Sequence, residues 1–154
     1  MALKFLLDML FPSLCIGCSE KTSGDAVICD KCASTIVLRS SLFCGKCNAR
    51  LPNGKKMCHF EYPYILGAGL DYRDKAVGAA IKYLKFKRDN RAATILGKFM
   101  AEYIKRAEFD TKSFFVLPVP LGRQRQRMRG FNQAELIAEV FAEKLDIPLL
   151  RDGL

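Results

Sequence analysis

VLPVPLGRQRQRMRGFNQAELIAE, residues 116–139, is the stretch of sequence that says most about how this chain folds. Residues 116–119 are mostly apolar and suit a buried strand, and Pro118 and Pro120 mark its end, because proline cannot donate a hydrogen bond to a sheet. Gly122 and Gly130 then bracket a loop, since glycine is frequent where the backbone turns. Four arginines lie in this loop: Arg123, Arg125, Arg127 and Arg129. The stretch therefore predicts a strand that leads into a strongly basic loop.

A helix is predicted directly after the loop. Asn132 is of a type preferred at a helix N-cap, Glu135 stands at the N3 position of a capping box, and apolar residues recur at helical spacing over 136–145. The free amides at a helix N-terminus attract anions, and guanidinium groups can bind phosphate through two parallel hydrogen bonds. We therefore expect an anion site between the loop and the helix. The alternative is a solvated basic loop that only joins a core strand to a core helix.

The positive charge of the chain is concentrated around this loop. The 154 residues carry a net charge of +9, and half of them are hydrophobic, so one ordinary domain or two small ones can bury a core. Residues 73–129 hold 15 Lys or Arg against 5 Asp or Glu, a local balance of +10. Such a field suits nucleic acid, a phosphorylated small molecule or simple solubility. A second basic group, for which a solvated face with lysine stems over apolar surface is the preferred interpretation, comprises Lys82, Lys85, Lys87, Arg88 and Arg91.

Seven cysteines have the spacing of metal ligands more than that of disulfides. The first four form a C-x2-C-x10-C-x2-C pattern: Cys15, Cys18, Cys29 and Cys32. Each C-x2-C turn points two sulfurs at one tetrahedral centre, so the pattern predicts a closed structural zinc site. Few large apolar residues lie between these cysteines, and bound metal would supply folding free energy that a core cannot.

The second group of cysteines repeats the pattern less completely. Cys44 and Cys47 form another C-x2-C pair, Cys58 follows with His59 beside it, and Glu61 stands where a fourth cysteine would fall. Three interpretations remain open: a second zinc site that uses His59 or Glu61, a degenerate site that has lost its metal, or cysteines kept as small buried residues.

The N-terminal residues 1–14 predict an amphipathic helix retained in the protein, with its leucines packed on the body of the molecule. Asp8 interrupts the short apolar run and no small-residue cleavage site follows, so a signal peptide is not expected. The hydropathy of the chain predicts no membrane span. An odd number of cysteines with metal spacing favours the reducing cytoplasm as the compartment.

Periodicity divides the chain into a zinc-ribbon-like module over residues 15–61 and an α/β region over 62–154, with Pro63 between them. Strands are expected over 64–70, 113–119 and from 147, and helices over 75–86 and 92–106. Alternating strands and helices predict a mostly parallel α/β sheet, which binds ligands at the carboxyl ends of its strands.

Four motifs resemble those of the ComF (ComFC/GntX-like) family of phosphoribosyltransferase-like proteins. They are the FPSLC-x2-C entry at 11–18, LKF at 84–86, PVPL at 118–121 and RGFNQAEL at 129–136. The resemblance implies an α/β protein in which a small N-terminal cysteine-rich zinc module precedes a type I phosphoribosyltransferase-like parallel sheet with flanking helices. It also implies a role in DNA uptake and natural transformation.

By this resemblance, residues 121–132 would hold the pyrophosphate of phosphoribosyl pyrophosphate (PRPP), with Mg²⁺ accompanying it in a complete protein. The implied contacts are Gly122, Arg123, Arg127, Arg129, Gly130 and Asn132. The family's D-D-x-x-T-T-G motif, which takes the ribose 5-phosphate, does not occur in the chain. We therefore expect a truncated or partial member with an incomplete sheet, which binds an anion without completing transferase chemistry, and we assign no catalytic residue.

Two other functions stay open at this stage. A zinc module, the local charge of +10 and exposed aromatic residues such as Phe86 would suit a single-stranded DNA-binding module. A module that interacts with DNA-uptake proteins, or a scaffold for them, is the other alternative.

Overall fold

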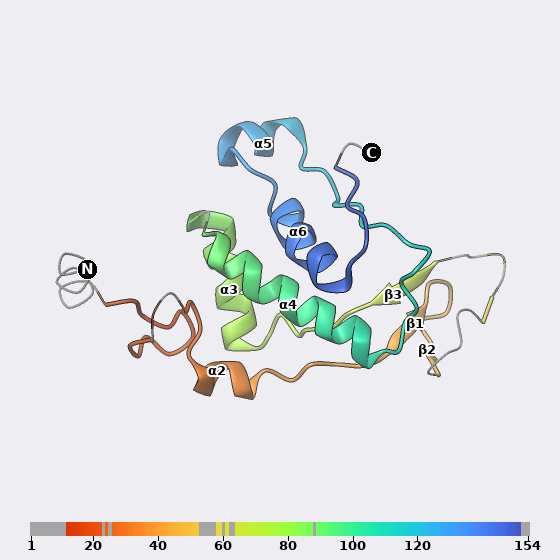
Figure 1. The fold of residues 1–154 in the computed structure, drawn as a ribbon, viewed down its shortest axis with the longest axis horizontal. Helices are drawn as coiled ribbons and strands as arrows, with labels where there is room; N and C mark the ends of the chain where they lie inside the picture. Colours follow the sequence, from red (N-terminus) through yellow and green to blue (C-terminus); the bar gives the residue numbers. More distant parts are fainter. Residues whose placement is uncertain are drawn as a thin grey trace.

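The computed structural model describes residues 12–22, 24, 26–52, 58–59, 61, 64–87 and 89–151 (Figure 1). The helix predicted over 1–14 lies almost wholly outside the described residues, as do Pro63 and Arg88. Residues 12–14 are not helical, because Leu14 forms an antiparallel bridge with Lys21.

Among the described residues, the cysteine-rich half forms a short helix and two strands of a small antiparallel sheet. Helix α2, Asp30–Thr35, begins at the N-cap Cys29. Strands β1, Leu42–Cys44, β2, Arg50–Leu51, and β3, Ile65–Gly67, form a sheet in the order β2-β1-β3 (Figure 1).

The strand expected over 64–70 in a parallel sheet is therefore wrong in length and in partner. It is present as β3, which pairs antiparallel with β1 of the cysteine-rich half. The strand ends early because the chain packs closely on Tyr103: a Cβ added at Gly69 would lie 2.7 Å from the Tyr103 Cγ atom. The boundary between 61 and 62 stays a prediction, and this sheet crosses it.

Three helices form the body of the molecule: α3, Lys75–Lys87, α4, Asn90–Arg106, and α6, Gln133–Leu145. All three were predicted from the apolar spacing, and the structure confirms them. The Asp74 and Asp89 side chains accept backbone amides of the first turns of α3 and α4. Helices α4 and α6 cross closely at Gly97, where an added Cβ would lie 2.7 Å from the Val140 Cβ atom.

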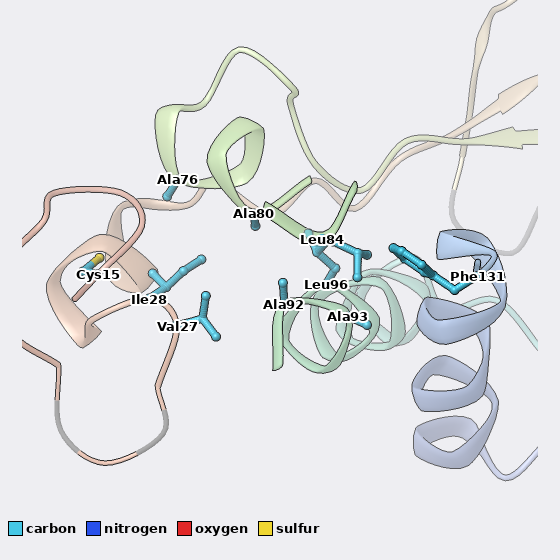
Figure 2. Packing of buried hydrophobic residues seen from close by; sticks show 10 residues of the cluster. All are labelled: Cys15, Val27, Ile28, Ala76, Ala80, Leu84, Ala92, Ala93, Leu96 and Phe131. Carbon is cyan, nitrogen blue, oxygen red and sulfur yellow. The ribbon is translucent and has the colours of Figure 1, made fainter. Parts of the chain in front are cut away.

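A continuous core joins the first cysteine group to the helices (Figure 2). Cys15, Val27 and Ile28 lie at one end of it and Phe131 at the other. The residues between them come from α3 and α4: Ala76, Ala80, Leu84, Ala92, Ala93 and Leu96. The zinc-ribbon-like half is thus packed against the helical body through apolar contacts.

The parallel sheet is reduced, within the described residues, to a single parallel bridge between Val116 and Leu149. The Val116 amide donates to the Pro148 carbonyl at 2.8 Å, and the Leu150 amide donates to the Val116 carbonyl at 2.9 Å. Prolines lack the amide that a longer ladder would need, and two isolated strand segments are only marginally stable. The strands predicted over 113–119 and from 147 are therefore wrong in extent, and the parallel sheet is not confirmed.

The predicted arginine loop is wrong in its backbone conformation, because residues Arg123–Arg129 form the short helix α5. Arginine, glutamine and methionine all have high helix propensity, which the loop prediction underestimated. Gly130 ends α5 in the left-handed conformation, with φ of 72°, so glycine is favoured there. Helix α5 lies outside the packed helices, and the chain runs from it directly into α6 (Figure 1).

Candidate metal centres and the arginine helix

The sulfurs of Cys15, Cys18, Cys29 and Cys32 all lie within 4.8 Å of one another. The Cys18 and Cys29 sulfurs are 3.6 Å apart. Zn–S bonds of about 2.3 Å in a tetrahedron require sulfur separations of about 3.8 Å. The four side chains therefore fit one zinc ion closely.

The first C-x2-C turn has the backbone geometry of a metal knuckle. The Cys15 amide donates to the Glu20 carbonyl at 2.8 Å, and the Ser19 amide donates to the Cys15 carbonyl at 2.7 Å. Ser19 has a positive φ of 63°, which turns the chain back after the second cysteine. Amides of Gly17 and Cys29 donate to the Cys15 sulfur at 3.4 and 3.3 Å.

The second C-x2-C turn repeats this geometry. The Cys44 amide donates to the Ala49 carbonyl at 3.0 Å, and the Asn48 amide donates to the Cys44 carbonyl at 2.9 Å. Asn48 has a positive φ of 56°. The two knuckles are thus structural repeats of one unit.

The second centre gathers Cys44, Cys47, Cys58 and His59, whose donor atoms also lie within 4.8 Å of one another. The His59 Nδ1 atom is 3.5 Å from the Cys44 sulfur and 3.1 Å from the Cys58 sulfur. A tetrahedral zinc with one imidazole requires about 3.6 Å for such a pair, so the first distance fits well and the second is short. The Glu61 carboxylate pairs with Lys46 Nζ at 3.3 Å. Of the three alternatives, the geometry favours a second metal centre with His59.

Each centre contains one cysteine that favours the thiolate form. Burial raises the pKa of Cys15, but the amides of Cys29, Cys18 and Gly17 outweigh it and lower that pKa to about 6. The Cys47 amide, followed by the Cys58 thiol and the His59 ring, lowers the pKa of Cys44 to about 5. Zinc binds the thiolate, so a lowered pKa makes both sulfurs better metal ligands.

In each centre one other cysteine favours the protonated form. Hydrogen bonds to the Cys18 and Cys29 sulfurs raise the pKa of Cys32 to about 12, and a hydrogen bond to Cys44 raises that of Cys58 to about 12. Metal binding must therefore release protons from each centre, which makes zinc affinity depend on pH.

The arginine helix α5 presents most of its side chains to solvent. Arg123, Arg125 and Arg127 are exposed, whereas Arg129 is partly buried and its Nη1 donates to the Gln133 Oε1 atom at 2.9 Å. Gly122 has an ordinary φ of −56°, and a Cβ added to it would meet no atom within 4 Å. Neither strain nor packing within the described residues explains this glycine, which leaves the backbone open to a close approach.

Asn132 joins the strand segment to α6. Its Oδ1 accepts the Ala134 amide at 3.1 Å, which confirms the predicted N-cap, and its Nδ2 donates to the Val119 carbonyl at 3.1 Å. The Glu135 carboxylate of the predicted capping box lies 3.6 Å from Arg151 Nε. Asn132, Arg129 and Gly130 are therefore brought together at the α5–α6 corner, while Arg123 and Arg127 extend along the exposed helix.

Gln133 also lies at this corner, although no sequence motif marked it as a site residue. It is the first residue of α6, accepts from Arg129, and has a buried Nε2 atom without a hydrogen-bond partner. A glutamine in a first helical turn is common, so only the tertiary contact distinguishes it.

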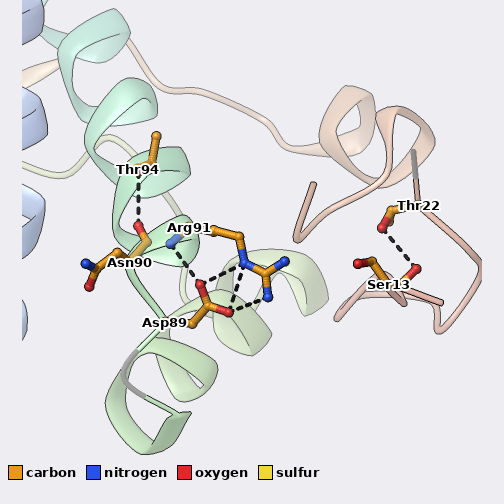
Figure 3. A network of polar contacts seen from close by, with 6 residues as sticks. All are labelled: Ser13, Thr22, Asp89, Asn90, Arg91 and Thr94. Atoms are coloured by element: carbon orange, nitrogen blue, oxygen red, sulfur yellow. Dashed lines mark hydrogen bonds and ion pairs between the residues drawn. The ribbon is translucent and has the colours of Figure 1, made fainter. Parts of the chain in front are cut away.

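The second basic group lies where α3 ends and α4 begins. The Asp89 carboxylate accepts the Arg91 amide and binds its guanidinium group, with a shortest distance of 2.6 Å (Figure 3). Phe86 is 72% exposed, and Lys85 Nζ lies 5.2 Å from its ring centre. This corner thus presents an aromatic face beside cationic side chains. Within the described part of the chain, no helix has the length and apolar character that crossing a membrane requires.

Residues 6–60 match the double zinc ribbon domain, which agrees with the two repeated knuckles. The chain therefore contains a double zinc ribbon, and its two groups of ligand atoms support structural zinc.

Curated relatives extend the similarity beyond the ribbon. The chain is 35% identical to Competence protein ComFC of Bacillus subtilis over 69 residues, 44% of this chain and 28% of that protein. It is 28% identical to Competence protein F of Haemophilus influenzae over 142 residues, 90% of this chain and 57% of that protein. It is 26% identical to the DNA utilization protein YhgH of Escherichia coli K12 over 129 residues, 82% of this chain and 52% of that protein.

Together with the ribbon, these similarities support the assignment of the chain to the ComF family, as its motifs predicted. The chain spans about half the length of the Haemophilus and Escherichia relatives and less of the Bacillus one. No solved structure matches the chain.

Proposed function

We propose that this protein acts in DNA uptake or DNA utilisation and binds a pyrophosphate-type anion, such as PRPP, at the α5–α6 corner. The observation that carries the proposal is the double hydrogen bond of Asn132, which holds the N-terminus of α6 against the strand segment at Val119. The arginine helix α5 lies in the segment that connects Val119 to Asn132. Free amides at the α6 N-terminus and the guanidinium group of Arg129 thereby lie at one corner, which is a common arrangement for phosphate binding.

The acidic residues near this corner support the proposal, because they are occupied elsewhere. Arg151 pairs with Glu139 at 2.7 Å and lies 3.6 Å from Glu135. Arg123, Arg125 and Arg127 form no ion pair within the described residues. The corner thus keeps its positive charge for a ligand. The ligating set that we propose comprises Gly122, Arg123, Arg127, Arg129, Gly130 and Asn132.

Binding is all that this chain's residues support, because it lacks the D-D-x-x-T-T-G motif that holds the ribose 5-phosphate in the family. Mg²⁺ would accompany a bound pyrophosphate and neutralise part of its charge. Structural zinc would be held by Cys15, Cys18, Cys29 and Cys32 and by Cys44, Cys47, Cys58 and His59. Zinc thiolates persist in reducing surroundings, so we propose the cytoplasm as the compartment.

Calorimetric titration of the zinc-loaded chain with pyrophosphate, PRPP and inorganic phosphate tests this function. We expect pyrophosphate and PRPP to bind more tightly than phosphate, and Arg129→Ala to weaken binding about ten-fold or more, as expected for a charge-assisted hydrogen bond. Arg73→Ala is the matched control, because Arg73 is 92% exposed and lies in the turn before α3. Equal affinity of Arg129→Ala and Arg73→Ala, or absence of pyrophosphate binding, would overturn the proposal.

A second candidate, single-stranded DNA binding, is favoured by the exposed Phe86 face beside Lys85. A base can stack on an exposed aromatic ring while lysines contact the backbone phosphates. Binding of a labelled oligonucleotide, measured against salt concentration, should then weaken in Phe86→Ala but not in Met100→Ala, which removes another exposed apolar side chain. If oligonucleotide binding is lost in Arg129→Ala and kept in Phe86→Ala, the DNA binds at the arginine helix instead.

A further inference from the structure

Gln133 forms a contact at the α5–α6 corner that stability alone does not explain. Its Oε1 accepts from the Arg129 Nη1 atom at 2.9 Å, while its buried Nε2 has no hydrogen-bond partner. An unpaired buried donor is destabilising, and this cost offsets most of what the charge-assisted hydrogen bond from Arg129 contributes to stability. An apolar side chain of the same volume would therefore stabilise the fold about as well.

Arg129 differs from the other arginines of α5 through this contact. It is partly buried, whereas Arg123, Arg125 and Arg127 are exposed. A free arginine loses side-chain entropy when it binds a ligand, and one already held in place loses less. Of the four guanidinium groups, that of Arg129 is the one whose position is set before a ligand arrives.

The Gln133 amide oxygen is a suitable acceptor for this role, because it orients the guanidinium group of Arg129 without neutralising its charge. A carboxylate at the same place would form an ion pair with Arg129 and cancel the charge that attracts an anion. The guanidinium group of Arg129 therefore keeps its positive charge, and its remaining N–H groups can donate to a ligand.

We propose that Gln133 is a positioning residue, which holds Arg129 at the N-terminus of α6 so that its free N–H groups bind pyrophosphate oxygens. This inference rests on the proposed anion site and goes beyond it by naming a residue that acts through Arg129. Gln133 itself need not touch the ligand.

Two substitutions separate positioning from stability. Gln133→Met keeps the volume and removes both the acceptor and the unpaired donor, so its unfolding temperature should stay close to that of the wild type. Its affinity for pyrophosphate should fall about ten-fold, as for a lost charge-assisted hydrogen bond. Gln133→Glu should lower the affinity at least as far, because the new carboxylate competes for Arg129.

Gln124→Glu is the matched control, since it makes the same change of charge on an exposed residue of α5. Screening by solvent should limit its effect to a few-fold at most. In an Arg129→Ala background, Gln133→Met should have no further effect on pyrophosphate binding, because the residue through which it acts is gone.

The outcomes of this titration distinguish the proposed anion site from the positioning role of Gln133. Failure of the wild-type chain to bind pyrophosphate overturns the proposed function itself. Wild-type binding with an unchanged affinity in Gln133→Met overturns the positioning role alone. A Gln133→Met protein that unfolds at lower temperature while it binds normally would show that the contact is structural.

Discussion

The two zinc centres should make unequal contributions to the helical body, and a pair of matched substitutions tests this. Cys18→Ser and Cys47→Ser each remove the second cysteine of a C-x2-C knuckle, and both side chains are exposed. Either substitution should lower the zinc content from two ions to about one per chain. Only loss of the first centre should reach the N-terminal part of α4, because Cys15, Val27 and Ile28 share the core cluster with Ala92 and Ala93 and Cys44 does not.

The magnitude follows from the side chains that the first centre holds in place. Val27 and Ile28 are 6% and 4% exposed, and burial of such a side chain contributes about 1.5–3 kcal/mol. Detachment of both would remove about 3–6 kcal/mol from the packing of α3 and α4. That is a large part of the 5–15 kcal/mol by which a typical domain is stable.

Hydrogen exchange read by mass spectrometry can locate the effect. Cys18→Ser should accelerate exchange of α4 amides around Ala92 and Ala93, while Cys47→Ser should accelerate exchange in the sheet of β1, β2 and β3. Zinc content is measured in the same samples. Equal acceleration around Ala92 and Ala93 for both variants, or no acceleration there in Cys18→Ser once its zinc is lost, would refute the coupling.

Three further predictions concern the helices. Gly97→Ala should destabilise the protein by about 1–3 kcal/mol in chemical denaturation, because its Cβ would lie 2.7 Å from the Val140 Cβ atom. Burial raises the pKa of Tyr103 above 10, and its hydroxyl donates to the Ser41 carbonyl at 2.6 Å. Its contribution to stability is therefore complete below about pH 10 and lost as pH rises through the raised pKa, a dependence that Tyr103→Phe should remove at a cost of about 1–3 kcal/mol at neutral pH. Asn132→Ala should lower the unfolding free energy by about 1 kcal/mol through loss of the N-cap, and circular dichroism against denaturant measures it.

Each of these predictions has a comparison in the same chain. Gly122→Ala should leave stability nearly unchanged, because its φ is −56° and an added Cβ meets open space. Equal destabilisation by Gly97→Ala and Gly122→Ala would contradict the close helix crossing. An unchanged alkaline transition in Tyr103→Phe would show that another group controls it, and Asn132→Ser, which can still cap, should restore most of what Asn132→Ala loses.

Residue spacing predicted the helices and one cap of this protein well, because these depend on neighbours within a few positions. The apolar spacing of α3, α4 and α6 and the cap at Asn132 were read correctly. The helical state of Arg123–Arg129 was missed, since glycines on both sides and a high charge suggested a loop. The sheet was missed for another reason: which strands pair depends on residues far apart, such as Phe43 with Leu66.

Sequence by itself determined which chemical groups this protein carries. The cysteine spacing predicted one sulfur-rich metal centre and left a second one open, and the run of arginines supplied positive charge, because ligand type and charge belong to the residues themselves. Tertiary structure decided which of these groups meet. It brought His59 to Cys44, Cys15 to the helical core, and Gln133 to Arg129. Residue spacing alone could therefore not define the second metal centre or the α5–α6 corner, because both depend on contacts that form only in the folded chain.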